Sequence, residues 1–102
     1  MNFRVRLRIR GRVQGVFYRK TACEQANLLG LAGWVRNMPD GSVESFALGS
    51  KEKLEAYIHW CKQGPPHASV DSVDAQWKEP PSEAEDDEDI EPGSLFAVRG
   101  GW

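Results

Sequence analysis

The residues best suited to chemistry lie in one glycine-bearing run, which reads Gly-Arg-Val-Gln-Gly-Val-Phe-Tyr-Arg over residues 11–19. The run follows a strand pattern and opens a helix pattern, so backbone N–H groups and the helix N-terminus can converge on one point. Arg19 can add a fork of guanidinium donors at that point. The run therefore predicts a cradle for a tetrahedral oxyanion such as phosphate, formed by Gln14, Gly15, Val16, Phe17, Tyr18 and Arg19.

A second candidate for chemistry is Asn37, which ends a predicted strand. This strand is expected to run parallel to the first one, which places Asn37 and the glycine-bearing run at the same end of the sheet. A neutral amide cannot take a proton at neutral pH, but it can hold a water molecule in line with phosphorus. Because no strong base is present, the substrate needs a good leaving group. The carboxylate of an acyl phosphate qualifies, since its acid has a pKa of about 4–5.

The elements that must position these residues follow from hydrophobic periodicity. Residues 3–10 alternate strictly between apolar side chains and arginines, which is the strongest strand signal in the chain. Further strands are predicted over residues 32–36, 43–48, 70–77 and 95–99, and helices over residues 17–29 and 51–62. Gly30 is a natural helix stop and Ser50 a natural N-cap. The order βαββαβ with a short extra strand favours an α+β ferredoxin-like sandwich, in which two helices cover one face of an antiparallel sheet.

Length and composition indicate one domain over residues 1–102, with an acidic loop at about 81–93. The apolar fraction of 40% is typical of a globular protein, and no run approaches the roughly 20 apolar residues that span a bilayer. No export signal is recognisable, so we expect a cytoplasmic protein. The net charge of −2 conceals an asymmetry, because seven of the 15 acidic residues lie between Glu83 and Glu91. The rest of the chain is basic, which favours anionic ligands.

The glycine-bearing run resembles the acylphosphatase family, as do Gly-Trp-Val-Arg-Asn over residues 33–37 and Asp-Gly-Ser-Val over residues 40–43. The resemblance covers residues 3 to about 79 and extends to the last predicted strand. It implies a ferredoxin-like fold and the hydrolysis of a small acyl phosphate to carboxylate and inorganic phosphate, without metal or other cofactor. By matched position, Arg19 is the phosphate-binding arginine and Asn37 the water-orienting asparagine. The acidic stretch and the ending Gly-Gly-Trp depart from the usual pattern, and a monomer is the default.

Two alternative functions remain open from the sequence. The arginines of the first strand form a stripe that Phe46 could share, and basic sheets with exposed aromatic rings bind RNA. A solvated face with cross-strand ion pairs, in which Glu44 offsets part of the stripe, is the simpler interpretation and makes nucleic-acid binding unlikely. The other alternative is a carbamoyl-phosphate-handling domain of the same shape, normally fused to a larger enzyme. The short chain argues against it.

The sulfur and imidazole side chains do not form a recognisable catalytic or metal motif. Cys61 lies on an apolar helix face and is expected to fill the core, and both cysteines are expected to be free thiols. Cys23 lies near the predicted helix N-terminus, which lowers thiol pKa values, but its side chain is expected off the apolar face of that helix, which disfavours a catalytic thiol. His59 and His67 are expected at the surface, which disfavours a phosphohistidine mechanism.

Overall fold

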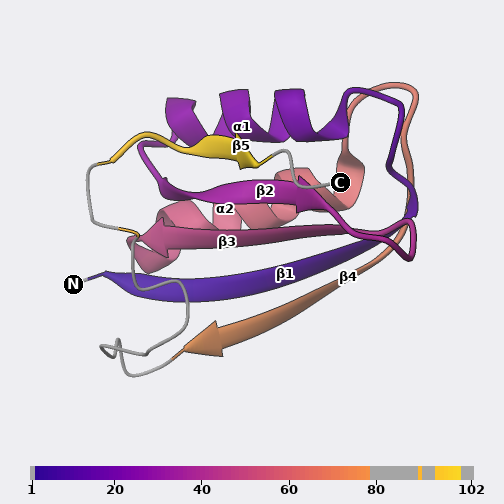
Figure 1. The fold of residues 1–102 in the computed structure, drawn as a ribbon. Helices are drawn as coiled ribbons and strands as arrows, with labels where there is room; N and C mark the ends of the chain where they lie inside the picture. Colours follow the sequence, from indigo (N-terminus) through magenta and orange to yellow (C-terminus); the bar gives the residue numbers. More distant parts are fainter. Residues whose placement is uncertain (1, 79–89, 91–93, 100–102) are drawn as a thin grey trace.

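The structure, a computed structural model, describes residues 2–78, 90 and 94–99. Two helices lie on one side of a five-stranded sheet whose strand order is β4-β1-β3-β2-β5 (Figure 1). The elements in chain order are β1 (Phe3–Arg12), α1 (Tyr18–Leu28), β2 (Ala32–Asn37), β3 (Val43–Gly49), α2 (Lys51–Gln63), β4 (Ser69–Lys78) and β5 (Ala97–Arg99). The predicted ferredoxin-like arrangement is confirmed. The predicted acidic loop falls outside the described residues, apart from Ile90.

The sheet is mixed rather than wholly antiparallel. Strands β1 and β3, β1 and β4, and β2 and β3 pair antiparallel, as predicted, whereas β5 pairs parallel with β2. The reason is topological: β4 ends at the side of the sheet where β1 and β2 begin. A strand that next starts from that side and adds beside β2 must run in the same direction as β2.

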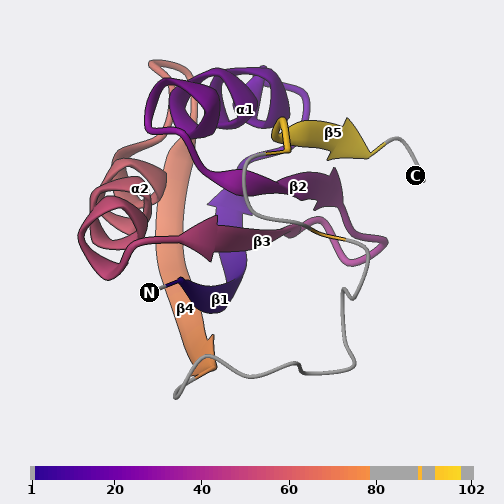
Figure 2. The ribbon, with the colours of Figure 1, turned by 90° about the vertical axis from the view of Figure 1, so that its left-hand side faces the viewer.

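The core lies between the sheet and the helix layer (Figure 2). The alternation in β1 has the predicted result, because Val5, Leu7 and Ile9 are fully buried. Each helix buries one face, through Tyr18, Ala22 and Ala26 in α1 and through Leu54, Tyr57 and Cys61 in α2. Cys61 therefore fills the core as expected.

The predicted stop at Gly30 and the predicted N-cap at Ser50 are both found in the structure. Gly30 adopts a left-handed φ of 75° just beyond α1, and the N–H of Leu31 donates to the carbonyl of Ala26 at 3.0 Å. This is a Schellman ending, which satisfies carbonyls that the helix leaves free. At the start of α2, the hydroxyl of Ser50 accepts a hydrogen bond from the N–H of Lys53 at 3.3 Å. None of the helices in the described part of the chain has the length and apolar character needed to span a bilayer.

The last strand is shorter than predicted but firmly anchored to the helix layer. The ring of Phe96 is buried and meets the ring of Tyr57 edge to face, with centroids 5.5 Å apart. The side chain of Asn27 in α1 forms two hydrogen bonds with the backbone of Phe96. Its Oδ1 accepts from the N–H of Phe96 at 2.9 Å, and its Nδ2 donates to the carbonyl of Phe96 at 3.3 Å. Leu95 is exposed and precedes the strand. These contacts anchor the residue before β5 to α2 and to the last turn of α1, and β5 itself pairs with β2.

The sheet face opposite the helices carries arginines over aromatic rings. Phe46 shares this face as expected, but it is fully buried rather than exposed. The guanidinium groups of Arg36 and Arg99 lie 4.9 and 4.7 Å from the ring centre of Trp34, and that of Arg6 lies 5.6 Å from the ring of Phe46. Because the rings are covered, they are not available for base stacking, and nothing favours the nucleic-acid interpretation.

Candidate active site

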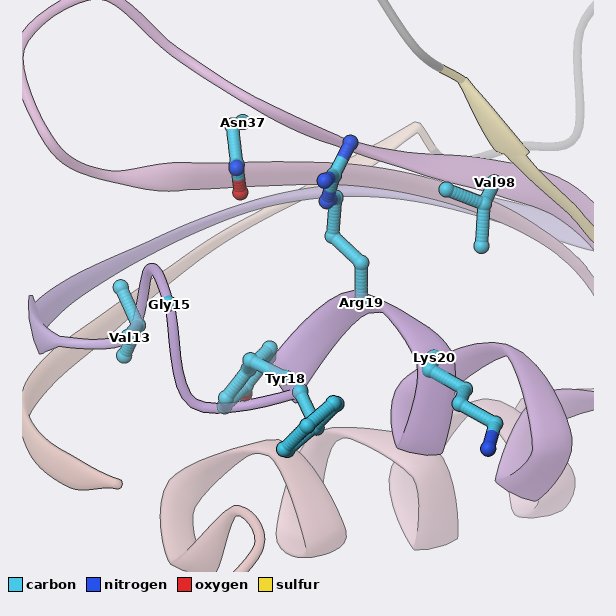
Figure 3. Close-up of a pocket in the computed structure, with 8 residues that line it drawn as sticks. Val13, Gly15, Tyr18, Arg19, Lys20, Asn37 and Val98 are labelled. Carbon is cyan, nitrogen blue, oxygen red and sulfur yellow. The ribbon is translucent and has the colours of Figure 1, made fainter. Parts of the chain in front are cut away.

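A cavity of about 310 Å³ opens at the end of the sheet where β1 and β2 finish. It brings together the two candidates for chemistry, Arg19 from the start of α1 and Asn37 from the end of β2 (Figure 3). The shared edge predicted from the parallel direction of β1 and β2 is therefore correct. The full lining consists of Val13, Gly15, Phe17, Tyr18, Arg19, Lys20, Asn37 and Val98.

The loop between β1 and α1 is shaped by two left-handed residues, Gly15 with a φ of 76° and Phe17 with a φ of 66°. Such kinks turn successive N–H groups toward one side, which is how backbone nests bind anions. Among the described residues, no acceptor is found for the N–H groups of Gly15, Val16 and Phe17. The loop therefore presents free donors next to the N-terminus of α1, where the helix dipole is positive.

Arg19 is the second residue of α1, and its side chain is half-buried at the cavity. Its Nη1 donates to the carbonyl of Arg99 in β5 at 3.2 Å, which holds the guanidinium beside the loop. Within the part of the chain that the structure describes, no carboxylate lies at ion-pair distance from Arg19. The guanidinium is thus held in position, and no carboxylate of the described residues neutralises its charge.

Asn37 has an unusual feature, because its Oδ1 is buried and accepts no hydrogen bond from any described residue. A buried polar atom without a partner is costly, and in native proteins such atoms call for a specific explanation. Here the amide faces the cavity, and Arg19 points into the same space from the opposite side (Figure 3). The oxygen therefore has a hydrogen-bonding capacity that the described residues leave unused, at the wall of the cavity.

Gln14 connects the two halves of the site instead of facing the cavity. Its Nε2 donates to the carbonyls of Met38 and Ser42, at 2.8 and 2.9 Å, in the turn that follows Asn37. That turn is itself closed by Asp40, whose Oδ1 accepts from the N–H and hydroxyl of Ser42. These hydrogen bonds hold the pKa of Asp40 below its usual value. The structure thus gives the Gln14 side chain a positioning contact that the sequence did not suggest.

Three lining residues, Val13, Lys20 and Val98, lie outside the predicted site residues. Lys20 follows Arg19 in the first turn of α1, and its position next to an arginine at a helix start is a signal that could have found it. Val98 reaches the cavity only because β5 packs against β2, and no local pattern indicates that pairing.

The thiols and imidazoles do not contribute to the cavity. Burial, together with the nearby Glu24, raises the pKa of Cys23 above its ordinary value, and Cys23 does not line the cavity, so the structure gives no support to a low-pKa nucleophile there. Burial also raises the pKa of Cys61, to about 12. His59 and His67 are exposed, as predicted. Among residues 2–78, 90 and 94–99, no three or more His, Cys, Asp or Glu side chains gather closely enough to hold a metal ion.

Fold and cavity together define a class: an α+β protein of ferredoxin-like topology with a pocket suited to a compact anion. The family model for acylphosphatase matches residues 5–89, and the chain belongs to the acylphosphatase family, a family of enzymes. The chain is 52% identical over 77 residues to an acylphosphatase of Thermococcus kodakarensis, covering 76% of this chain and 85% of that one.

Solved structures agree with this assignment. An acylphosphatase from Coxiella burnetii superimposes with a TM-score of 0.80 at 32% identity, over 96% of this chain and 93% of the other. The crystal structure of acylphosphatase from Bacillus subtilis gives a TM-score of 0.81 at 29% identity, over 95% and 98% of the two chains. The fold is therefore that of the family.

Proposed function

We propose that the chain hydrolyses acyl phosphates to a carboxylate and inorganic phosphate at the cavity between the β1–α1 loop and the end of β2. Arg19 and the backbone N–H groups of residues 14–19 bind the phosphoryl oxygens and stabilise the charge on them in the transition state. Asn37 orients the attacking water. These roles agree with the free loop donors and with the guanidinium that β5 holds in place.

The reaction consists of a single in-line displacement at phosphorus. The water oxygen forms a bond to phosphorus while the bond between phosphorus and the acyl oxygen breaks. The carboxylate leaves with the electron pair of that bond, and the proton released by the water passes to phosphate or solvent. Since a carboxylate is a weak base, no side chain has to protonate it, and positioning together with electrostatic stabilisation supplies the catalysis.

The observation that carries the proposal is the buried Oδ1 of Asn37, which has no partner among the described residues and lines the same cavity as Arg19. An amide oxygen that accepts a hydrogen bond from a water molecule fixes the orientation of that water, so that a lone pair of the water points away from the amide. With phosphate held by Arg19 and the loop, that lone pair faces phosphorus. The cost of leaving Oδ1 unpaired is then recovered when the water binds.

The positive charge of Arg19, together with the helix dipole, supplies the field that a phosphoryl group needs. The proposed reaction accordingly uses no metal ion and no organic cofactor. The proposal also includes a monomeric enzyme that acts in the cytoplasm, where Cys23 and Cys61 would remain the free thiols that the structure has.

The test is hydrolysis of benzoyl phosphate, without added metal and with a chelator, by the wild type and by Asn37→Ala. We expect kcat to fall about 10²–10³-fold in the variant, while inorganic phosphate still competes with substrate at a similar inhibition constant. A folded variant that keeps its kcat would remove Asn37 from the mechanism, and loss of wild-type activity on chelation would contradict metal independence.

A further inference from the structure

A second cavity, of about 290 Å³, lies beside the proposed phosphate cavity. Its walls come from the start of α1 and from the loop after α2, and most of its side chains are apolar. The wall residues are Val16, Phe17, Thr21, Pro65, Pro66 and His67, with Lys20 at the rim. The mechanism above does not use this apolar groove.

The groove adjoins the phosphate cavity, because Phe17 and Lys20 line both. The side chain of Phe17 is 74% exposed, which is unusual for a phenylalanine and leaves its ring free to contact a ligand. Its left-handed backbone conformation places it at the bend of the loop, directly before the first helical residue. The ring therefore stands at the border between the charged cavity and the groove.

The groove is held in shape by contacts below it. Gly64 ends α2 with a φ of 71°, and a Cβ there would lie 3.0 Å from the ring of Tyr18, so the backbone packs directly on that ring. The hydroxyl of Tyr18 donates to the carbonyl of Cys61 at 2.7 Å, and the N–H of Ala68 donates to the carbonyl of Pro65 at 3.0 Å. The loop after α2 and the start of α1 lie side by side in both views (Figures 1 and 2).

The direction of the reaction points toward the groove. In-line displacement puts the attacking water and the leaving oxygen on opposite sides of phosphorus. Asn37 approaches from the end of β2, whereas Phe17 directly precedes α1 and Pro66 follows α2, on the side of the site where the helices lie. A leaving carboxylate that departs away from Asn37 therefore carries its acyl group toward the helix layer.

We infer that the groove formed by Phe17, Pro65 and Pro66 binds the acyl group of the substrate, and that it favours acyl phosphates with a flat apolar or aromatic acyl group over short ones. The inference rests on the proposed function. Phe17 is then a specificity-determining residue through its ring, in addition to any contribution of its backbone N–H. The apolar walls exclude water from the acyl group without contacting the reacting atoms.

The experiment compares kcat/KM for benzoyl phosphate and for acetyl phosphate, and the readout is the ratio of the two. We expect Phe17→Ala to lower this ratio about threefold to tenfold, the scale of one lost aromatic contact. Pro66→Ala should lower it by a smaller factor. Alanine and phenylalanine share the same steric resistance to a positive φ, so the substitution preserves the backbone preference of the loop.

Leu28→Ala is the matched control, because Leu28 is 83% exposed and lies at the far end of α1. It should leave the ratio at the wild-type value. Val98→Ala tests the other apolar side of the phosphate cavity, and a fall in the ratio there instead of in Phe17→Ala would overturn the assignment. Equal losses on both substrates in Phe17→Ala would also overturn it. Failure of the wild type to hydrolyse either substrate would instead refute the proposed function itself.

Discussion

Two groups of arginines in this molecule differ in what surrounds them. On the open sheet face, Glu44 accepts hydrogen bonds from Arg6 at 3.0 Å and from Arg36 at 2.6 Å, and Arg8 lies 3.8 Å from the same carboxylate. At the cavity, Arg19 donates only to a neutral carbonyl, with no described carboxylate nearby. The first group has its charge matched by the chain itself, whereas the charge of Arg19 is left for a ligand.

The comparison shows that arginine content does not by itself indicate an anion site. Where a buried carboxylate pairs with guanidinium groups that also stack on aromatic rings, the charges are satisfied within the fold, and removing one partner is destabilising. A guanidinium beside free backbone donors and an unsatisfied amide is instead prepared for a substrate. The open sheet face and the cavity therefore differ in whether the protein itself supplies the negatively charged partner of the arginines.

The largest expected difference between the regions is in activity. Arg19→Ala should lower kcat/KM for benzoyl phosphate by about 10²–10³-fold or more, because it removes the charged donors to the phosphoryl group. Arg6→Ala should retain activity within about twofold, since its partners lie on the other face of the sheet. Initial-rate kinetics on both folded variants makes the comparison. Similar losses in the two variants would show that the two groups of arginines do not differ in function.

Stability should show the opposite pattern. Burial alone would raise the pKa of Glu44, but hydrogen bonds from Arg36 and Arg6 bring it below its ordinary value. A lowered folded-state pKa gives stability that is present above the unfolded value and lost as pH falls through the folded one. Glu44→Gln should therefore cost about 1–3 kcal/mol at pH 7 and less in acid. Denaturant unfolding at both pH values measures this, with Arg19→Ala as the comparison variant.

A smaller effect is expected at the contact that joins the two halves of the site. Gln14→Met keeps the length of the side chain but removes both donors to the turn after Asn37. We expect kcat to fall about three- to tenfold, because Asn37 is less well held, while phosphate inhibition changes little. A positioning role requires that kcat move more than the inhibition constant. A change in stability alone would show that Gln14 is only structural.

The smallest expected effect is on the pH profile. No imidazole lines the cavity, and the raised pKa of Cys23 keeps that thiol protonated through the neutral range. The value of kcat should therefore vary little between about pH 6 and pH 8. A sharp bell in this interval would assign the water-activating role to a titrating group in place of Asn37.

Much of the fold could be predicted because the signals are local. The alternation over residues 3–10, the stop at Gly30 and the cap at Ser50 each specify an element or a boundary through neighbouring residues alone. The candidate pair of Arg19 and Asn37 also followed from the sequence, since strand direction fixes which loops share an edge. The sequence by itself thus determined the helices and strands, their order along the chain, and the fact that the ends of β1 and β2 lie at the same edge of the sheet.

Tertiary structure decided the rest, because it depends on contacts between distant residues. The parallel pairing of β5, the burial of Phe46 under arginines, and the contact of Gln14 with the turn at Met38 all join segments far apart in sequence. No local pattern encodes these pairings, since each depends on which surfaces the folded layers bring together. The same holds for the groove beside Phe17, which exists only because the loop after α2 packs against the start of α1.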